Sequence, residues 1–400
     1  MRKVLLFIFL MPLCSVSFSQ SISDNLMHSK ALASSGKYDL AISVLTKAIE
    51  SATDYRLYLM RAEVNEAKGD YSAAINDYNE ANKINSLSGE YGLARVYAMK
   101  GDVQTSLYHL EQNMSTDIKK SEKEIMLDPG FTGVGKKADW RNFWKKEHYT
   151  WVERTVSEIE FYTKSGMLAD ASLLVSELKS KYPGADETMY SDAILNIASG
   201  KPLEAVKMMS KITTGTISNE KYIRVIADAQ AASSNYAGAS DSYTRLIDSG
   251  TSDARLLLAR AECYRKTGEI DKSISDIDKY LEYYPDDMTA LRMAGKARAA
   301  SGDNLKALEL FNRNLELHPN EPELYADRGN SYLAARSWSW AIKDYSMSLD
   351  LKPSDPEVWL NKGLALLNSG HRDEACHDFR KALRMGNKRA SEYINSNCIR

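Results

Sequence analysis

A spacing of about 34 residues recurs along most of this chain and limits the folds that it can adopt. Short strings such as "GKYDLAI", "GDYSAAI" and "GDNLKAL" share one frame, and a small residue stands at the same place in every unit. These small residues are Ala41, Ala74, Ser106, Ala171, Ala205, Ala239, Ser273, Ala307, Ala341 and Ala375. From Ala171 onward the step between them is identical six times, whereas the step from Ser106 to Ala171 is nearly double. A regular period of this length indicates a stack of similar supersecondary units.

Two other positions keep the same phase. Nine of the ten units have a small residue at one fixed place further upstream, such as Ala62 or Gly329, and all ten have an apolar residue one helical turn downstream. Prolines at 183, 285, 319 and 353 close four of the units, at points where a helix has to end. Because the chain has only 9 prolines and 21 glycines, it favours helices elsewhere. Each unit is therefore predicted to be two helices joined by a short turn.

This pattern resembles the tetratricopeptide repeat, here of an exported bacterial type. The resemblance implies an all-α fold, a right-handed α-solenoid of about ten helix pairs with one degenerate unit and a C-terminal capping helix. It also implies a concave groove that binds peptides or proteins, without catalysis. The organisation expected on this basis is a signal peptide at 1–19, N-terminal repeats at 22–113, a degenerate aromatic-rich unit or insertion at 114–151, seven consecutive repeats at 152–389 and a capping helix at 390–400.

The N-terminus has the pattern of a secretion signal. Two basic residues precede the apolar run "VLLFIFLMPL", and "SFSQS" offers small residues for cleavage near Ser19. The run is too short to span a bilayer, and no second one follows. Leu13 stands before Cys14 where a lipoprotein signal needs a small residue, so a lipid anchor is not favoured. The mature chain is expected to be exported, to the periplasm or outside the cell, without a transmembrane segment.

The long interval between Ser106 and Ala171 is predicted to contain a degenerate unit. Its aromatic residues have two competing interpretations. Three of the six tryptophans of the chain lie in it, namely Trp140, Trp144 and Trp151. These rings either stack on sugars or a partner, as in a glycan- or peptidoglycan-binding module, or fill the core where repeat packing fails. We expect mainly the second role, with one ring left exposed.

The same segment contains "GFTGVGKK" (Gly130–Lys137), which nearly matches a phosphate-binding loop. Lys137 replaces the Ser or Thr that would ligate Mg²⁺, and no strand is predicted before it. A nucleotide-binding enzyme is therefore a minor alternative. The chain has no other catalytic or metal-ligand motif, so we expect neither an enzyme nor a cofactor. Its net charge of −2 gives no reason to expect a nucleic acid partner.

The resemblance places a protein or peptide partner against the first helix of each repeat. The residues expected on that face are Tyr91, Arg95, Arg224, Asp228, Arg255, Glu262, Arg292, Lys296 and Asn330. The four cations from Arg224 onward fall in successive repeats and would form a basic strip that holds carboxylates, unless they are simply solvated.

The cysteines near the C-terminus suggest a structural bond. Cys376 stands in a slot that is apolar in most units, whereas His377 stands in a polar slot. Neighbouring helix residues point about 100° apart, so this pair does not form a metal site or a nucleophile dyad. Cys398 ends the capping helix, which has to pack on the helix of Cys376. We predict a disulfide between them and a buried thiol at Cys263.

Overall fold

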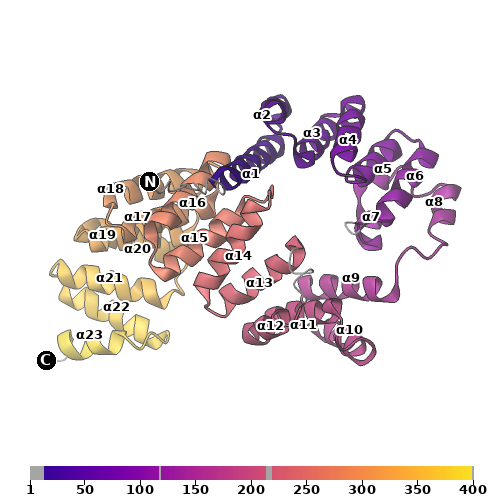
Figure 1. Ribbon diagram of the computed structural model, residues 1–400. Coiled ribbons are helices and arrows are strands. Elements are labelled where there is room, and N and C mark those ends of the chain that lie inside the picture. Colours follow the sequence, from indigo (N-terminus) through magenta and orange to yellow (C-terminus); the bar gives the residue numbers. More distant parts are fainter. Residues whose placement is uncertain (1–12, 117–118, 213–218, 399–400) are drawn as a thin grey trace, which may run out of the picture. The chain divides into compact units, whose positions relative to one another are not determined.

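The computed structural model describes residues 13–116, 119–212 and 219–398, and this part of the chain is helical without any strand (Figure 1). Residues 1–12 of the predicted signal peptide lie outside the described residues, and the remainder starts the first helix. No helix in the described ranges combines the length and apolarity needed to cross a membrane.

The helices follow one another as pairs, which confirms the predicted all-α fold of stacked helix pairs. The first three pairs are α1 (Leu13–Ser34) with α2 (Tyr38–Ser51), α3 (Tyr55–Lys68) with α4 (Tyr71–Ile84), and α5 (Glu90–Met99) with α6 (Val103–Met114). The pairs after the degenerate segment are α9 (Trp151–Lys164) with α10 (Leu168–Lys181), α11 (Asp186–Ala198) with α12 (Pro202–Met209), α13 (Glu220–Ala232) with α14 (Tyr236–Asp248), α15 (Arg255–Thr267) with α16 (Ile270–Tyr283), α17 (Met288–Ala300) with α18 (Asn304–Leu317), α19 (Pro322–Ala334) with α20 (Trp338–Leu351), and α21 (Pro356–Asn368) with α22 (Arg372–Arg384).

Two compact units divide the chain between Cys263 and Tyr264, inside α15. The N-terminal unit ends at Cys263, and the C-terminal unit begins at Tyr264. The division that the sequence predicts at 114–151 stays a prediction.

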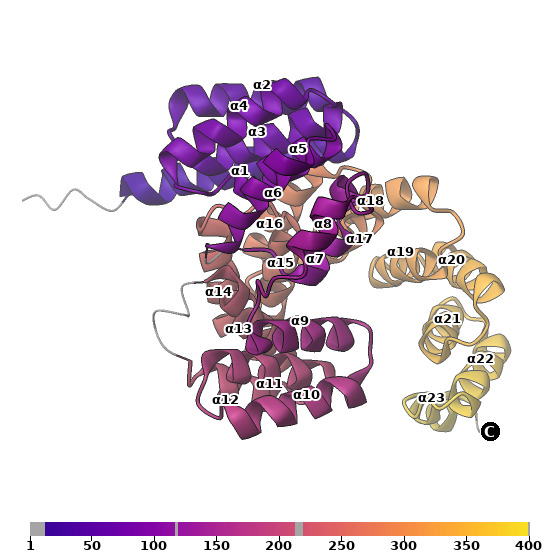
Figure 2. The same ribbon diagram turned by 90° about the vertical axis from the view of Figure 1, so that its right-hand side faces the viewer.

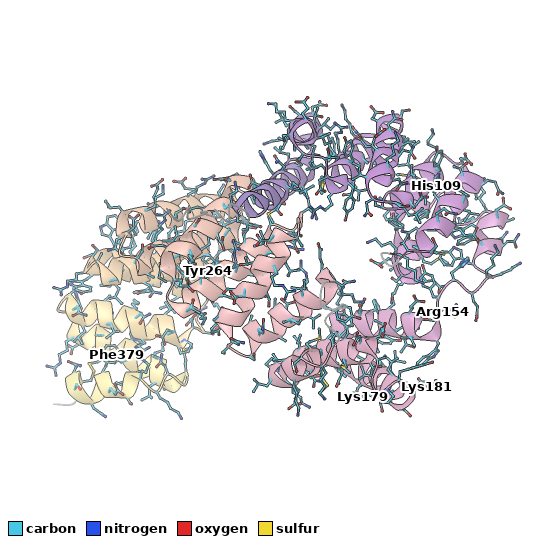
Figure 3. All side chains as sticks on the ribbon, viewed as in Figure 1. His109, Arg154, Lys179, Lys181, Tyr264 and Phe379 are labelled. Atoms are coloured by element: carbon cyan, nitrogen blue, oxygen red, sulfur yellow. A yellow bond between two sulfur atoms is a disulfide. The ribbon has the colours of Figure 1, made fainter. Side chains whose placement is uncertain are left out.

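Small residues in the first helices make room for aromatic rings of the second helices. A Cβ atom added to Gly363 on α21 would lie 2.6 Å from the ring of Phe379 on α22, and one added to Gly329 would lie 2.8 Å from the ring of Tyr345. Both rings are fully buried, and Figure 3 labels Phe379 among the last helices. The fixed small position is therefore a packing requirement between paired helices.

A second recurring device, which we call the arginine bridge, ties three of the pairs to the pair before them, through Arg61, Arg260 and Arg328. Arg328 on α19 donates two hydrogen bonds of 2.7 Å to Asp344 on α20 and one of 2.8 Å to Asn312 on α18. In the N-terminal unit Arg61 does the same with Asp77, at 2.7 and 2.9 Å, and with Thr46, at 3.0 Å. The arginine stands directly before the small position of the first helix, and the acid follows 16 residues later. Bidentate pairs of this kind fix orientation as well as energy.

The degenerate segment folds into α7 (Glu122–Leu127), a 3₁₀ turn η1 (Pro129–Phe131) and α8 (Ala138–Phe143). Pro129 begins a new turn because it cannot continue the helix before it. Phe131 and Trp140 stack with ring centroids 5.2 Å apart and are 3% and 4% exposed. They pack with Leu110 and Ile125, so these rings mainly fill the core.

The array ends with α23 (Ala390–Asn397), which packs on α22 as Figure 2 shows. A disulfide joins Cys376 on α22 to Cys398, with their Cα atoms 5.6 Å apart. The side chain of His377 is 67% exposed while Cys376 is buried, so they face different ways as the helix geometry predicts. Cys263 keeps its thiol in the core, and burial raises its pKa to about 11.

Candidate partner-binding face

The first helices of successive pairs contact one another directly. In the N-terminal unit α3 contacts both α1 and α5, and α11 contacts both α9 and α13. In the C-terminal unit α19 contacts both α17 and α21. We call the surface formed by such neighbours the first-helix face. Seven of the nine predicted partner residues stand on its helices, and Arg255 and Glu262 stand on α15.

On α5 the predicted residues Tyr91 and Arg95 already hold a carboxylate of their own chain. The Tyr91 hydroxyl donates to Asp128 Oδ2 at 2.5 Å, and Arg95 Nε lies 3.0 Å from the same oxygen. Arg95 also reaches Glu66 on α3, with Nη2 and Oε1 3.0 Å apart. Asp128 belongs to the turn between α7 and η1, so the degenerate segment covers this part of the face. The repeat pattern gives no signal for Asp128, because that residue stands outside any regular repeat.

Burial changes the acidity of Glu66 in this cluster. Its side chain is 6% exposed, and burial raises its pKa although the Arg95 guanidinium and the Tyr78 hydroxyl, which donates at 2.9 Å, oppose the shift. A raised pKa means that the folded chain holds this proton more tightly than the unfolded chain does.

We therefore expect Glu66 to make the free energy of unfolding fall as the pH rises from its unfolded pKa through its raised folded pKa. Below that window Glu66 is protonated in both states and contributes its full share of stability. The variant Glu66→Gln keeps a hydrogen-bond acceptor for Tyr78 but cannot titrate, so it should lack this part of the slope. Urea unfolding at a series of pH values measures the effect, and an unchanged slope in the variant would contradict it.

The predicted cations Arg224 and Arg255 also form ion pairs within the chain. Arg224 on α13 lies 3.0 Å from Asp253, and Arg255 lies 2.9 Å from the same carboxylate. Asp228 accepts a 2.8 Å hydrogen bond from the Tyr243 hydroxyl, and its burial raises its pKa. Glu262 stands on α15, one residue before the end of the N-terminal unit.

In the C-terminal unit Asp327 on α19 pairs with both Arg292 and Lys296 on α17, with Lys296 Nζ 3.0 Å from Oδ1. Asn330 accepts hydrogen bonds from the Tyr345 hydroxyl at 2.7 Å and from Asn361 on α21 at 3.1 Å. Each cation of the predicted basic strip thus has a carboxylate of its own chain, with which a partner's carboxylate would compete. The role of these residues in partner binding stays a prediction.

The three tryptophans of the predicted aromatic patch differ in how far they are buried. Trp140 is buried, Trp144 is half-buried, and Trp151 at the start of α9 is 38% exposed. Trp151 lies beside Tyr182, which is 45% exposed, with ring centroids 6.2 Å apart. Lys181 covers part of this pair, with its Nζ 3.9 Å from the centre of the Trp151 ring.

The segment Gly130–Lys137 does not have the surroundings of a phosphate-binding loop. It runs from η1 to the start of α8, and the element before it is helix α7 rather than a strand. Across the described part of the chain, no three His, Cys, Asp or Glu residues gather as a group that could hold a metal ion.

Comparisons with known proteins agree with the helix pairs. A tetratricopeptide repeat family profile matches residues 26–86, 224–287 and 264–322, and a second one matches residues 356–386. No curated protein matches this sequence.

Solved structures with a similar fold include a chain of the APC/C Cut9–Hcn1 heterotetramer, at 15% identity and a TM-score of 0.52, covering 93% of this chain and 83% of that one. A tetratricopeptide repeat protein from Parabacteroides merdae ATCC 43184 matches at 18% identity and a TM-score of 0.51, covering 62% of this chain and 99% of that one. At these identities the likeness concerns the fold. The helix pairs of this chain thus include tetratricopeptide repeats.

Proposed function

We propose that this chain is a non-enzymatic scaffold of the cell envelope that binds a peptide or protein partner on its first-helix face. The observation that carries the proposal is the direct contact between successive first helices, such as α17, α19 and α21, which forms a continuous surface across several repeats. An extended peptide or a helix is the kind of ligand that such a surface accepts.

The side chains on this face support a polar ligand. Lys296 is 46% exposed although it pairs with Asp327, so it keeps donors for a second acceptor. Asn330 and Asn361 add amide groups, which bind a peptide backbone in either direction. The similarity to a chain of the APC/C Cut9–Hcn1 heterotetramer is consistent with this role, since that chain is found in a complex of two proteins.

Photo-crosslinking from defined positions tests the proposal. A photoreactive amino acid at Asn330, in the full chain exported by its own leader, should give crosslinks to the same partner in repeated experiments. The matched control places the same group at Lys306, which lies at the start of the second helix α18 and pairs with Glu309. The proposal fails if no reproducible partner is crosslinked from Asn330, or if Lys306 gives the same crosslinks.

Export is part of the proposal and has its own test. The leader pattern at 1–19 and the disulfide between Cys376 and Cys398 support an oxidising compartment. Cell fractionation should find the mature chain outside the cytoplasm, beginning near residue 20. A full-length chain retained in the cytoplasm would contradict this part.

A glycan-binding module is the second candidate, and only the exposed pair of Trp151 and Tyr182 favours it. Aromatic rings at a surface stack on the C–H faces of sugars. Quenching of tryptophan fluorescence by sugar fragments, lost in Trp151→Ala, would support this function over the first.

A further inference from the structure

In α11 the slot of the bridging arginine holds an acidic residue. Asp192 on α11 occupies the slot directly before the small residue of the first helix, which holds an arginine in three other pairs (Arg61, Arg260 and Arg328) and Lys362 in a fourth. The residue 16 positions later, an aspartate in the bridges of Arg61 and Arg328, is Met208 here. No arginine therefore spans from α11 to the helix before it.

A surface pocket of ≈ 490 Å³ lies at this slot, between α10, α11 and the start of α12. Ser176 lines it and stands 16 residues before Asp192, as Thr244 stands before Arg260 and Asn312 before Arg328. Thr244 and Asn312 each accept a hydrogen bond from the arginine of their bridge, at 3.0 and 2.8 Å. By register, the pocket therefore includes the place where Arg260 and Arg328 reach the preceding helix in their own pairs.

The lining has donors that the protein does not use. In the described part of the chain, the side chains of Ser172, Ser176 and Ser199 make no hydrogen bond, and Lys201 has no ion-pair partner. Lys179, which Figure 3 labels near the end of α10, is 50% exposed and places Nζ 2.8 Å from Asp192 Oδ1. An ammonium group has three donors, so Lys179 retains two for a ligand.

The charge and the apolar residues of the pocket restrict the chemical class of its ligand further. Two lysines against one aspartate leave a net positive lining, and the aspartate is already neutralised by Lys179. Leu168, Val175 and Leu195 supply an apolar wall. The free hydroxyl groups both donate and accept hydrogen bonds, which suits a ligand that carries hydroxyl groups itself.

We propose that this pocket binds a small hydroxylated carboxylate of the sugar-acid class. The carboxylate lies between Lys179 and Lys201, the serine hydroxyls hold the ligand's hydroxyls, and the C–H face of its ring covers the apolar wall. The volume is within the range of small-molecule sites, about 300–1,000 Å³. None of the predicted partner residues lines this pocket.

Titration of the full-length mature protein with D-glucuronate, followed by ligand-observed NMR and calorimetry, tests the proposal. D-glucose is the neutral control and inorganic phosphate is the control for a non-specific anion. Glucuronate should bind at least tenfold more tightly than either. Equal binding of glucose would show that the lysines contribute nothing, and equal binding of phosphate would show an adventitious ion only, so both results would overturn the proposal.

Rebuilding the missing bridge provides the decisive variant. In Asp192→Arg/Met208→Asp a guanidinium should extend into the pocket toward Ser176, as Arg328 reaches Asn312, so the helices are kept while glucuronate binding falls at least tenfold. Lys201→Ala, which removes an exposed cation without a protein partner, should weaken binding about tenfold. Lys207→Ala, an exposed lysine of α12 outside the pocket, is its matched control and should leave binding unchanged. Native-like binding by the rebuilt variant would refute the site even if the protein proved to bind sugar acids elsewhere.

Discussion

Replacing Arg328 by methionine is expected to lower the free energy of unfolding by about 3 kcal/mol. The substitution leaves the Asp344 carboxylate, whose side chain is 4% exposed, without its bidentate partner. A buried charge that loses its partner cannot recover the solvation that folding removed, and this is why breaking such a pair costs more than the pair itself contributes. Urea denaturation followed by circular dichroism measures the loss, and hydrogen exchange should localise it to the helices around α19 and α20.

Two further variants separate the buried charge from other effects of the mutation. The double variant Arg328→Met/Asp344→Leu removes both charges and should recover most of the loss. The matched single variant is Arg313→Met, which breaks an exposed pair with Asp286 at 2.8 Å and should cost less than about 1 kcal/mol. If Arg328→Met and Arg313→Met had equal effects, the arginine bridge would not be a stabilising device of the repeat.

Replacing Cys398 by serine is expected to lower the free energy of unfolding of the last repeats by about 3 kcal/mol. The disulfide closes a loop with a sequence separation of 22 residues, and its main effect in the chain-entropy model is to restrict the unfolded chain. Because α23 packs on α22 and α22 packs on α21, fraying should begin at α23 and spread toward α21. Thermal unfolding with hydrogen exchange measures both the size and the place of the loss.

A reducing agent supplies the control for the disulfide. It should destabilise the native chain by the same amount and leave Cys398→Ser unchanged. Alkylation of exported protein that labels both Cys376 and Cys398 without reduction would show that the bond is not formed, and the prediction would then fail.

Local sequence rules accounted for the parts of this protein that repeat. The regular period, the small residue and the closing prolines each determine how one helix packs on the next. These contacts join residues that are close together in the sequence. The same rules assigned Cys376 to the core and Cys398 to the cap. They also indicated that Pro129 interrupts its helix, because a proline in a helix interior removes a hydrogen bond and clashes with the preceding turn.

The sequence predicted the ion pairs at the candidate sites less well than it predicted the helix pairs. Position in the repeat placed Arg95, Arg292 and Lys296 on first helices, but their partners Asp128 and Asp327 belong to other elements, far along the chain. Whether a surface cation is solvated or paired depends on which carboxylate the packing of neighbouring pairs brings within about 4 Å of it.

The sequence by itself determined the architecture, the helix pairs and the end of the array, because one periodic set of small, aromatic and proline residues allows a single way of stacking. Only the tertiary structure decided that the degenerate segment places Asp128 on Arg95, that Trp151 stays exposed while Trp140 is buried, and that an aspartate in an arginine slot leaves a pocket beside Ser176. Each of these outcomes depends on side chains from several pairs meeting in space, and no period in the sequence encodes such a meeting.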